Sequence, residues 1–188
     1  FSTLLAAYGY YHAATKNDSG WKKLANIAYS VQGISMLAVI ATIFYLMINK
    51  HYEYSYVQAH VSDDLPFQYI FSAFWEGQEG SFLLWMFLHA ILGFILMMTA
   101  KSWEAPVLAT LAVIQVFIFS MIVGVYFDLG GVEYRFGSSP LMLLRDVMEA
   151  PIFAKADYVA SIKGTGLNPL LQNYWMTIHP PTLFLGFA

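Results

Sequence analysis

The chain of 188 residues contains no cysteine and very few charged side chains. Without Cys it offers no disulfide, no thiol nucleophile and no thiolate metal ligand. Charged residues make up only 11% of the chain, whereas a soluble domain carries roughly 25%. Hydrophobic residues make up 59% and aromatic residues 18%, so the composition predicts a membrane protein. The net charge of −3 and the lack of a basic patch argue against a nucleic-acid partner.

A membrane-spanning helix needs about 20 mostly apolar residues, and several such runs are present. Three are complete and two lie at the chain ends: 27–48, 82–100 and 106–127, then 1–12 and 181–188. The first residue is Phe and the last lies in an apolar run, so we expect a piece of a longer protein. No cleavable signal peptide is visible. We expect one transmembrane domain over residues 1–188, an all-α polytopic helix bundle with structured outer loops.

Four lysines predict how this bundle is oriented. They lie in the short connections that follow the runs 1–12 and 82–100: Lys16, Lys22, Lys23 and Lys101. Short basic connections stay on the cytoplasmic side of a membrane. The outer loops are then 49–80 and 128–178, which contain most of the acidic residues. His179 is expected to emerge on the same, non-cytoplasmic side.

Both outer loops have features of folded structure. Residues 51–71 are rich in Tyr and Phe, which favour the bilayer interface. In the second loop, Ser139-Pro140 predicts the start of a helix that reaches about Ala150, with its acidic and apolar residues on different sides. Such a helix is expected either to lie on the membrane surface or to pack on the other outer loop.

The sequence His179-Pro180-Pro181 stands directly before the last apolar run. Proline fixes φ and suits the first turn of a helix, so the motif predicts a helix that begins at the prolines, with His179 held at its boundary. A neutral imidazole is a common metal ligand and a standard axial ligand of haem iron. The motif alone leaves two interpretations open, a haem ligand or a His that hydrogen-bonds locally.

A second candidate site is the segment from Trp75 to Trp85, WEGQEGSFLLW, which precedes the run 82–100. Its glycines permit a tight turn or the close approach of a ligand, and Ser81 is suited to cap the new helix. The segment is therefore either a well-capped helix start or one wall of a site for a cofactor or a quinone head group. No residue in it is assigned as a catalytic acid.

Four motifs in order resemble the CcmF-type haem lyases of the cytochrome c maturation system, a family that includes NrfE and CcsA proteins. Trp75 to Trp85 resembles the tryptophan- and glycine-containing segment of that family. The outer-loop residues Tyr56 to Pro66 and the stretch Leu167 to Asn173 resemble two further family segments. His179 to Phe187 resembles the segment with the periplasmic haem-ligating histidine.

The resemblance implies a multi-pass protein of the bacterial inner membrane with periplasmic functional loops. It would receive haem from the periplasmic chaperone CcmE and assist its attachment to the CxxCH thiols of apocytochrome c, together with thiol-handling partners. His179 would be one axial ligand of this haem, and Trp75, Gly80, Pro180 and Pro181 would line the cavity. A haem b would pass electrons from quinol. Its ligands, the second periplasmic ligand and the tryptophan-rich signature are expected beyond residue 188.

The chain also departs from the family pattern. Gln78 stands where the family commonly has His, and the loop 139–166 is longer than usual, as for a contact with a partner. Two other histidines remain candidates of a weaker kind. His89 lies within an apolar run and is expected to be a neutral side chain hydrogen-bonded to a neighbouring helix. His60 lies near an interface on the same side as His179; it is expected to hydrogen-bond locally, and a position near a haem edge is the alternative.

Two other classes of function stay open on the sequence. A quinone-coupled respiratory or transport subunit needs ionisable groups inside its spans, and the three complete runs contain no Asp or Glu and only His89. A non-catalytic assembly scaffold, with outer loops that bind partner proteins, agrees with the aromatic loops. No catalytic residue is assigned.

Overall fold

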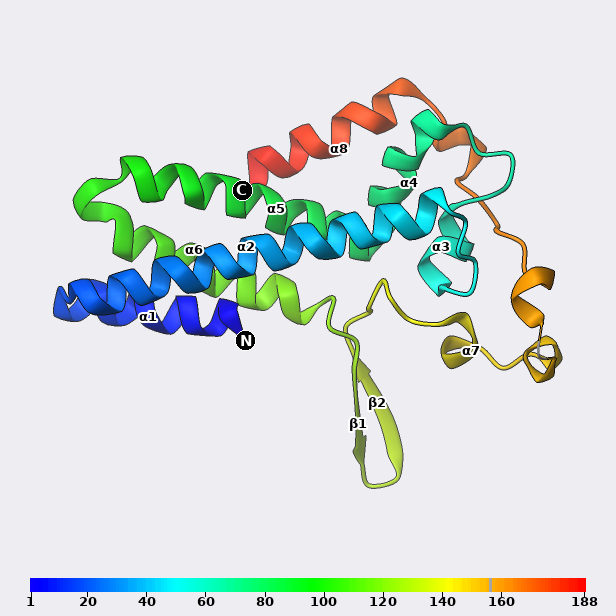
Figure 1. The fold of residues 1–188 in the computed structure, drawn as a ribbon, viewed down its shortest axis with the longest axis horizontal. Coiled ribbons are helices and arrows are strands. Elements are labelled where there is room, and N and C mark those ends of the chain that lie inside the picture. Colours follow the sequence, from blue (N-terminus) through cyan, green and yellow to red (C-terminus); the bar gives the residue numbers. More distant parts are fainter. Residues whose placement is uncertain (156) are drawn as a thin grey trace.

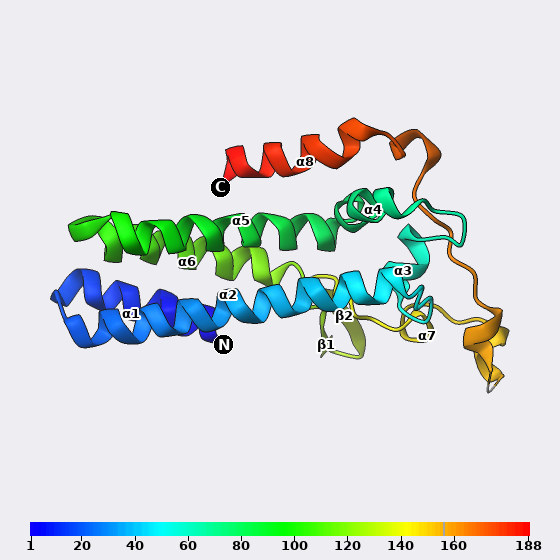
Figure 2. The same cartoon turned by 45° about the horizontal axis from the view of Figure 1, so that its top comes forward.

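The computed structural model describes residues 1–155 and 157–188, and it is a helix bundle whose outer loops gather at one end (Figures 1 and 2). Four helices form the bundle: α1 (Ser2–Lys16), α2 (Ser19–Ile48), α5 (Gln78–Thr99) and α6 (Glu104–Ser120). A fifth long helix, α8 (Tyr174–Phe187), lies along α5. The all-α membrane fold expected from the sequence is confirmed.

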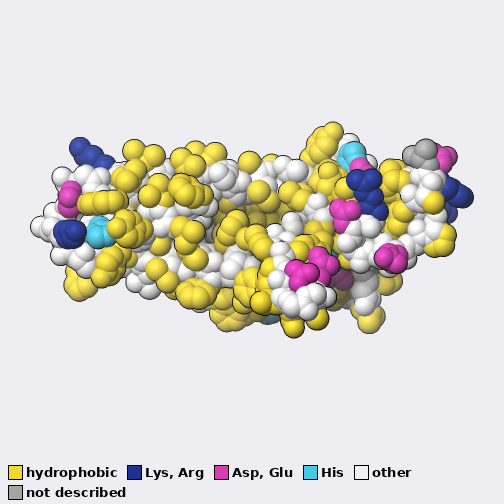
Figure 3. Space-filling view, turned by 90° about the horizontal axis from the view of Figure 1, so that it is seen from below, with side chains coloured by type: hydrophobic (Ala, Val, Ile, Leu, Met, Phe, Trp, Pro, Cys, Tyr) yellow, Lys and Arg dark blue, Asp and Glu magenta, His cyan; other side chains and the backbone are white. Residues whose placement is uncertain are grey.

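Among the described residues, three helices are long and apolar enough to cross a membrane, namely α2, α5 and the stretch Lys101–Ser120. Their outward faces carry exposed apolar side chains, such as Ile27, Ile34 and Phe117. Lipid favours apolar residues on such faces, whereas water favours charged ones. Figure 3 shows the same pattern on one side of the molecule, with apolar side chains along the bundle and charged side chains near its two ends.

The ends of two helices differ from the predicted runs. Helix α2 begins at Ser19, well before residue 27, because Asp18 caps it and accepts a hydrogen bond from the Gly20 N–H at 2.7 Å. Helix α6 ends at Ser120, so the predicted continuation to Phe127 is wrong. Gly124 has a φ of +65°, which leaves the right-handed helical region, and a β-hairpin follows.

The hairpin pairs β1 (Val125–Leu129) with β2 (Val132–Phe136) in antiparallel register. Gly130 and Gly131 form its turn, both with positive φ, as a type I′ hairpin turn requires. Every residue of both strands is exposed. The hairpin projects from the outer end of the bundle (Figure 1).

The first outer loop folds into α3 (Ser55–His60), the short 3-10 helix η1 (Phe67–Tyr69) and α4 (Ile70–Glu76). The second outer loop contains α7 (Leu144–Val147). Three short 3-10 helices follow it: η3 (Pro151–Ala154), η4 (Tyr158–Ser161) and η5 (Pro169–Leu171). One more short 3-10 helix, η2 (Lys101–Trp103), lies outside these loops and leads into α6.

The predicted helix from Ser139 to Ala150 is wrong in length, because α7 has only four residues. The backbone at this point instead hydrogen-bonds to the first outer loop. Leu143 pairs with Tyr54 in an isolated β-bridge, and the Leu144 N–H donates to the Glu53 carbonyl at 2.7 Å. Of the two expected placements, the structure shows packing on the other outer loop.

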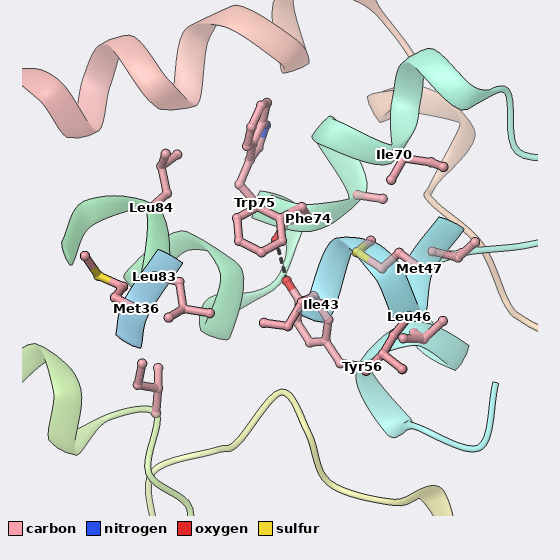
Figure 4. Close-up of a cluster of buried hydrophobic side chains, with 14 of the residues drawn as sticks. Met36, Ile43, Leu46, Met47, Tyr56, Ile70, Phe74, Trp75, Leu83 and Leu84 are labelled. Carbon is pink, nitrogen blue, oxygen red and sulfur yellow. Dashed lines mark hydrogen bonds between the residues drawn. The ribbon is translucent and has the colours of Figure 1, made fainter. Parts of the chain in front are cut away.

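Two buried clusters hold the bundle together. One lies among α1, α2 and α6, where Ala25 packs closely against Gly9 and the small side chains let the helices approach. The other is larger and lies under the outer loops, where α2, α3, α4 and α5 meet (Figure 4). The second cluster is the base on which the candidate site is built.

The lysine-bearing connections lie at the opposite end from the outer loops. There Lys22 forms an ion pair with the buried Glu104, and the Asn26 amide donates to the same carboxylate at 3.0 Å. This contact ties the start of α2 to the start of α6. A buried carboxylate is costly unless it is paired and hydrogen-bonded, and Glu104 is both.

Candidate functional site

His179 lies inside α8, so the predicted helix boundary at the prolines is wrong. Helix α8 begins at Tyr174, where the Asn173 side chain caps it and accepts a hydrogen bond from the Met176 N–H at 3.1 Å. Asparagine is among the strongest N-cap residues, and it places the helix start five residues before His179. Pro180 and Pro181 therefore occupy interior positions of the helix.

The two faces of α8 have different environments. Met176, Pro180 and Phe184 are spaced four residues apart and are partly buried, and the Phe184 ring lies 6.0 Å from that of Trp85 on α5. Trp175, His179 and Leu183 each precede one of these residues and are also four residues apart, and all three are exposed. Residues four apart share one side of a helix. Helix α8 thus presents His179 on an exposed face between a tryptophan and a leucine.

This exposed face fits one side of a haem. A haem needs an axial ligand such as imidazole, and its flat macrocycle favours apolar surface. Within the described residues no hydrogen bond or ion pair engages the His179 imidazole, and Trp175 is 71% exposed beside it. The same residues contain no group of three or more His, Asp or Glu side chains placed to hold a metal ion.

Trp75 lies under α8. Its indole Nε1–H donates a hydrogen bond to the Met176 carbonyl at 2.8 Å, and the side chain is 9% exposed. Figure 4 shows the indole extending from α4 toward α8. A second contact joins the same helices, since the hydroxyls of Ser72 and Thr177 lie 2.9 Å apart. The structure therefore brings Trp75 next to the helix that carries His179, across 101 residues of sequence.

Gly80 occupies a buried junction at the start of α5. A Cβ atom built on it would lie 1.6 Å from the Phe74 carbonyl oxygen and 2.5 Å from the Tyr56 hydroxyl, distances that no side chain tolerates. The turn at Gly77 to Gly80 is thus a close approach of backbone to backbone. It fixes where α4 ends and α5 begins.

The carboxyl group of Glu76 is also enclosed by the outer loops. Burial raises its pKa, while the nearby His60 and a hydrogen bond from the Asn168 backbone lower it in part. Within the described residues its Oε2 atom is buried without a hydrogen-bond partner. His60 donates from Nδ1 to the Tyr56 carbonyl at 2.7 Å when that nitrogen carries the proton, and its Nε2 lies against Gly77. Sequence reasoning missed this acid–histidine neighbourhood.

The segment before α8 is held on the first outer loop. The Gln58 side chain donates to the Lys163 carbonyl and to the Thr165 hydroxyl, each at 3.1 Å, and the Thr165 N–H donates to the Gln58 carbonyl at 2.7 Å. Gly164 lies so close to Val61 that a Cβ would meet its carbonyl at 1.8 Å. These contacts bring the two loop motifs together.

A polar pocket of about 210 Å³ opens beside this region. Arg135 of the hairpin donates to the Ser138 hydroxyl at 2.6 Å, and Ser138 donates to Glu79 at 2.5 Å. Tyr56 and His60 also line it. The sequence offered no signal for this chain of contacts, because Glu79 and Ser138 are 59 residues apart.

Two features lie away from His179. A larger, mostly apolar cavity of about 600 Å³ is lined by α1, α2, α5 and α6, and it includes the buried Gln32 but no predicted site residue. His89 is buried in α5 near Trp85, with no partner for its Nδ1 among the described residues. The expected hydrogen bond from the His89 side chain to a neighbouring helix is therefore absent in the part of the chain that the structure describes.

The chain is similar to several curated cytochrome c-type biogenesis proteins. It is 27% identical over 175 residues to CcmF of Pseudomonas fluorescens, across 93% of this chain and 24% of that protein. It is 30% identical over 154 residues to CcmF of Haemophilus influenzae, across 82% of this chain and 21% of that protein. NrfE of Haemophilus influenzae is 26% identical over 172 residues, across 88% of this chain and 23% of that protein.

These similarities confirm the family resemblance that the four motifs indicated. The chain spans about a quarter of the length of the relatives it matches. No family model matches the chain, and no solved structure does.

Proposed function

We propose that this relative of the CcmF and NrfE cytochrome c-type biogenesis proteins acts in cytochrome c maturation, in the part of a membrane haem lyase that holds haem through His179. One observation carries the proposal: an exposed imidazole stands on the outward face of α8, and that helix is fixed to the outer end of a membrane bundle. Similarity to proteins named for cytochrome c biogenesis supports it.

In this proposal the residues of the chain bind and orient haem. The His179 imidazole is one axial ligand of the iron, and Trp175 and Leu183 supply apolar surface beside it. Trp75, Pro180 and Pro181 support His179 from beneath, and Gly80 fixes the turn next to Trp75. Bound haem supplies the group that becomes attached to the thiols of the apocytochrome. The second axial ligand belongs to residues after 188.

The partners follow from the same proposal. Haem arrives from the periplasmic chaperone CcmE, and apocytochrome c with its thiol-handling partners receives it. A separate haem b, held by residues other than these, would supply electron transfer from quinol. Residues 1–188 act as one transmembrane unit in the bacterial inner membrane, with the loops 49–80 and 128–178 in the periplasm. The lysines at the other end of the bundle support this orientation.

The test is His179→Ala in the full-length protein, compared with His51→Ala. His51 lies at the same end of the bundle, but its imidazole pairs with Glu53 at 2.8 Å. We expect His179→Ala to reduce both the haem trapped from the chaperone and the yield of cytochrome c, with haem b retained. His179→Cys should keep some haem with a shifted absorbance spectrum, because a thiolate also ligates iron. Normal maturation in His179→Ala would refute the proposal.

A further inference from the structure

The two prolines inside α8 remove backbone hydrogen-bond donors from the helix. A helical N–H donates to the carbonyl four residues earlier, and proline has no N–H. Pro180 therefore leaves the Met176 carbonyl without its helical donor. An interior proline is costly to a helix for this reason, and leaving a partly buried carbonyl unsatisfied adds to that cost. Some other group must supply the missing hydrogen bond.

That group is the indole of Trp75. Its Nε1–H donates at 2.8 Å to the Met176 carbonyl, which lacks its helical donor because residue 180 is proline. Trp75 is almost fully buried, and its ring packs near Phe71 and Phe74 of the same helix. The donor therefore comes from a side chain that is itself held in place. A rigid donor fixes the direction as well as the presence of a hydrogen bond.

A second contact strengthens the same junction. Ser72 and Trp75 are three residues apart and so lie on one face of α4. They reach Thr177 and Met176, which are adjacent on α8. Helix α4 thus holds two consecutive residues of α8. His179 follows within the next turn, and its side chain is exposed.

We infer that Trp75 is a positioning residue: its indole replaces the backbone donor that Pro180 removes and so sets the angle at which α8 presents His179. The hydrogen bond stands on the geometry alone. Its consequence at iron rests on the proposed function. Pro180 also has a role in this pairing. Because it has no N–H, the Met176 carbonyl is free to accept a hydrogen bond from another helix, whereas in an ordinary helix this carbonyl would accept one from the residue four positions later.

A double-mutant cycle in the full-length protein tests this inference. Trp75→Phe keeps an aromatic ring and removes the N–H, whereas Pro180→Ala returns a backbone N–H to the Met176 carbonyl. We expect Trp75→Phe alone to increase hydrogen exchange in the peptide 174–179 by about 10-fold. In the Pro180→Ala background the same change should alter exchange by less than about 2-fold, because the helix then supplies its own donor.

Trp85→Phe is the matched control. Trp85 also packs on α8, with its ring 6.0 Å from that of Phe184, but its indole nitrogen has no hydrogen-bond partner among the described residues. The substitution thus removes the same group next to the same helix without breaking a bond. Exchange in the peptide 174–179 should change by less than about 2-fold.

The haem spectrum and reduction potential give the second readout. Trp75→Phe should shift both for the haem held by His179, and the double variant should move back toward the wild type. Equal exchange in wild type and Trp75→Phe would overturn the inference, as would equal effects of Trp75→Phe in both backgrounds. Altered exchange with unaltered haem, while His179→Ala loses haem, would overturn the positioning role. If His179→Ala leaves haem unchanged, the proposed function fails, and the exchange cycle still decides whether Trp75 supplies the bond.

Discussion

The Tyr56 hydroxyl donates a hydrogen bond to the Phe74 carbonyl at 2.5 Å (Figure 4). The same oxygen accepts a hydrogen bond from the Gly80 N–H at 3.2 Å. One buried phenol therefore connects α3, the end of α4 and the start of α5. Burial raises the pKa of Tyr56, so the hydroxyl keeps its proton and acts as a donor at any physiological pH. The junction beneath Trp75 and α8 depends on this single oxygen.

Removing that oxygen should destabilise the outer end of the bundle. Tyr56→Phe leaves a buried carbonyl and a buried N–H without their partner, which costs about 1–3 kcal/mol. We expect a lower free energy of unfolding, measured by chemical denaturation in detergent. Tyr174→Phe is the control, because Tyr174 is exposed and should change stability by less than about 0.5 kcal/mol. Equal stability of the two variants would show that the Tyr56 bridge is not formed.

Gly80 is expected to tolerate no side chain. In Gly80→Ala the new Cβ would meet the Phe74 carbonyl, which is backbone and cannot rotate away. We expect a loss of at least about 3 kcal/mol or failure to accumulate. Gly186→Ala is the matched control, since nothing lies within 4 Å of a Cβ built there. It should be neutral or stabilise by up to about 1 kcal/mol. A well-folded Gly80→Ala would refute the close approach.

Glu76 should make stability depend on pH. Its pKa in the folded protein is raised above the ordinary 4.5 by burial, so its favourable contribution is complete below about pH 4.5 and is lost as the pH rises through the raised pKa. Glu76→Gln cannot ionise and keeps nearly the same size and shape. We expect the stability of the variant relative to wild type to increase with pH over this range.

The exposed Glu133→Gln on β2 provides the control for that measurement and should show no such trend. Thermal midpoints measured from pH 4 to pH 8 in the same detergent would be compared. A constant difference between Glu76→Gln and wild type at every pH would contradict the assignment of a buried, ionisable Glu76.

The predicted orientation can be read by labelling single cysteines on a background that has none. Ser19→Cys at the lysine-bearing end and Ser161→Cys in the second outer loop each exchange one atom at an exposed site. A membrane-impermeant maleimide applied to whole spheroplasts should label position 161 only, and position 19 only after the membrane is opened. Labelling of both from one side would contradict the topology.

The sequence predicted the helices well where lipid imposes one rule along the whole segment. Every span must satisfy its backbone within itself, so apolar length alone located α2 and α5. It failed at the end of α6, where the glycine turn at Gly124 interrupts a run that remains apolar to Phe127. Apolar residues suit an exposed hairpin at a membrane interface as well as a span, and composition does not separate the two.

Local rules also misplaced the start of α8. Proline is favoured in a first turn, but a proline inside a helix is tolerated when another group satisfies the carbonyl that it frees, as for Pro180 and the Met176 carbonyl. Here that group is Trp75, 101 residues away from Met176. No pattern near His179 reports such a partner. Gly80 differs, because its close neighbour is the Phe74 carbonyl only six residues earlier, and the glycines of this segment did predict a tight turn.

The bonds between Gln58 and the segment 163–165 also set an order of events during synthesis. Their partners are 105 and 107 residues apart in sequence. Helices α5 and α6 and the hairpin are all made between them. In the proposed orientation, Gln58 therefore has no partner in segment 163–165 until α5, α6 and the second outer loop have been made. Because distant contacts form only after the chain between them is in place, His179 reaches its final position last, after the membrane part of the bundle has assembled.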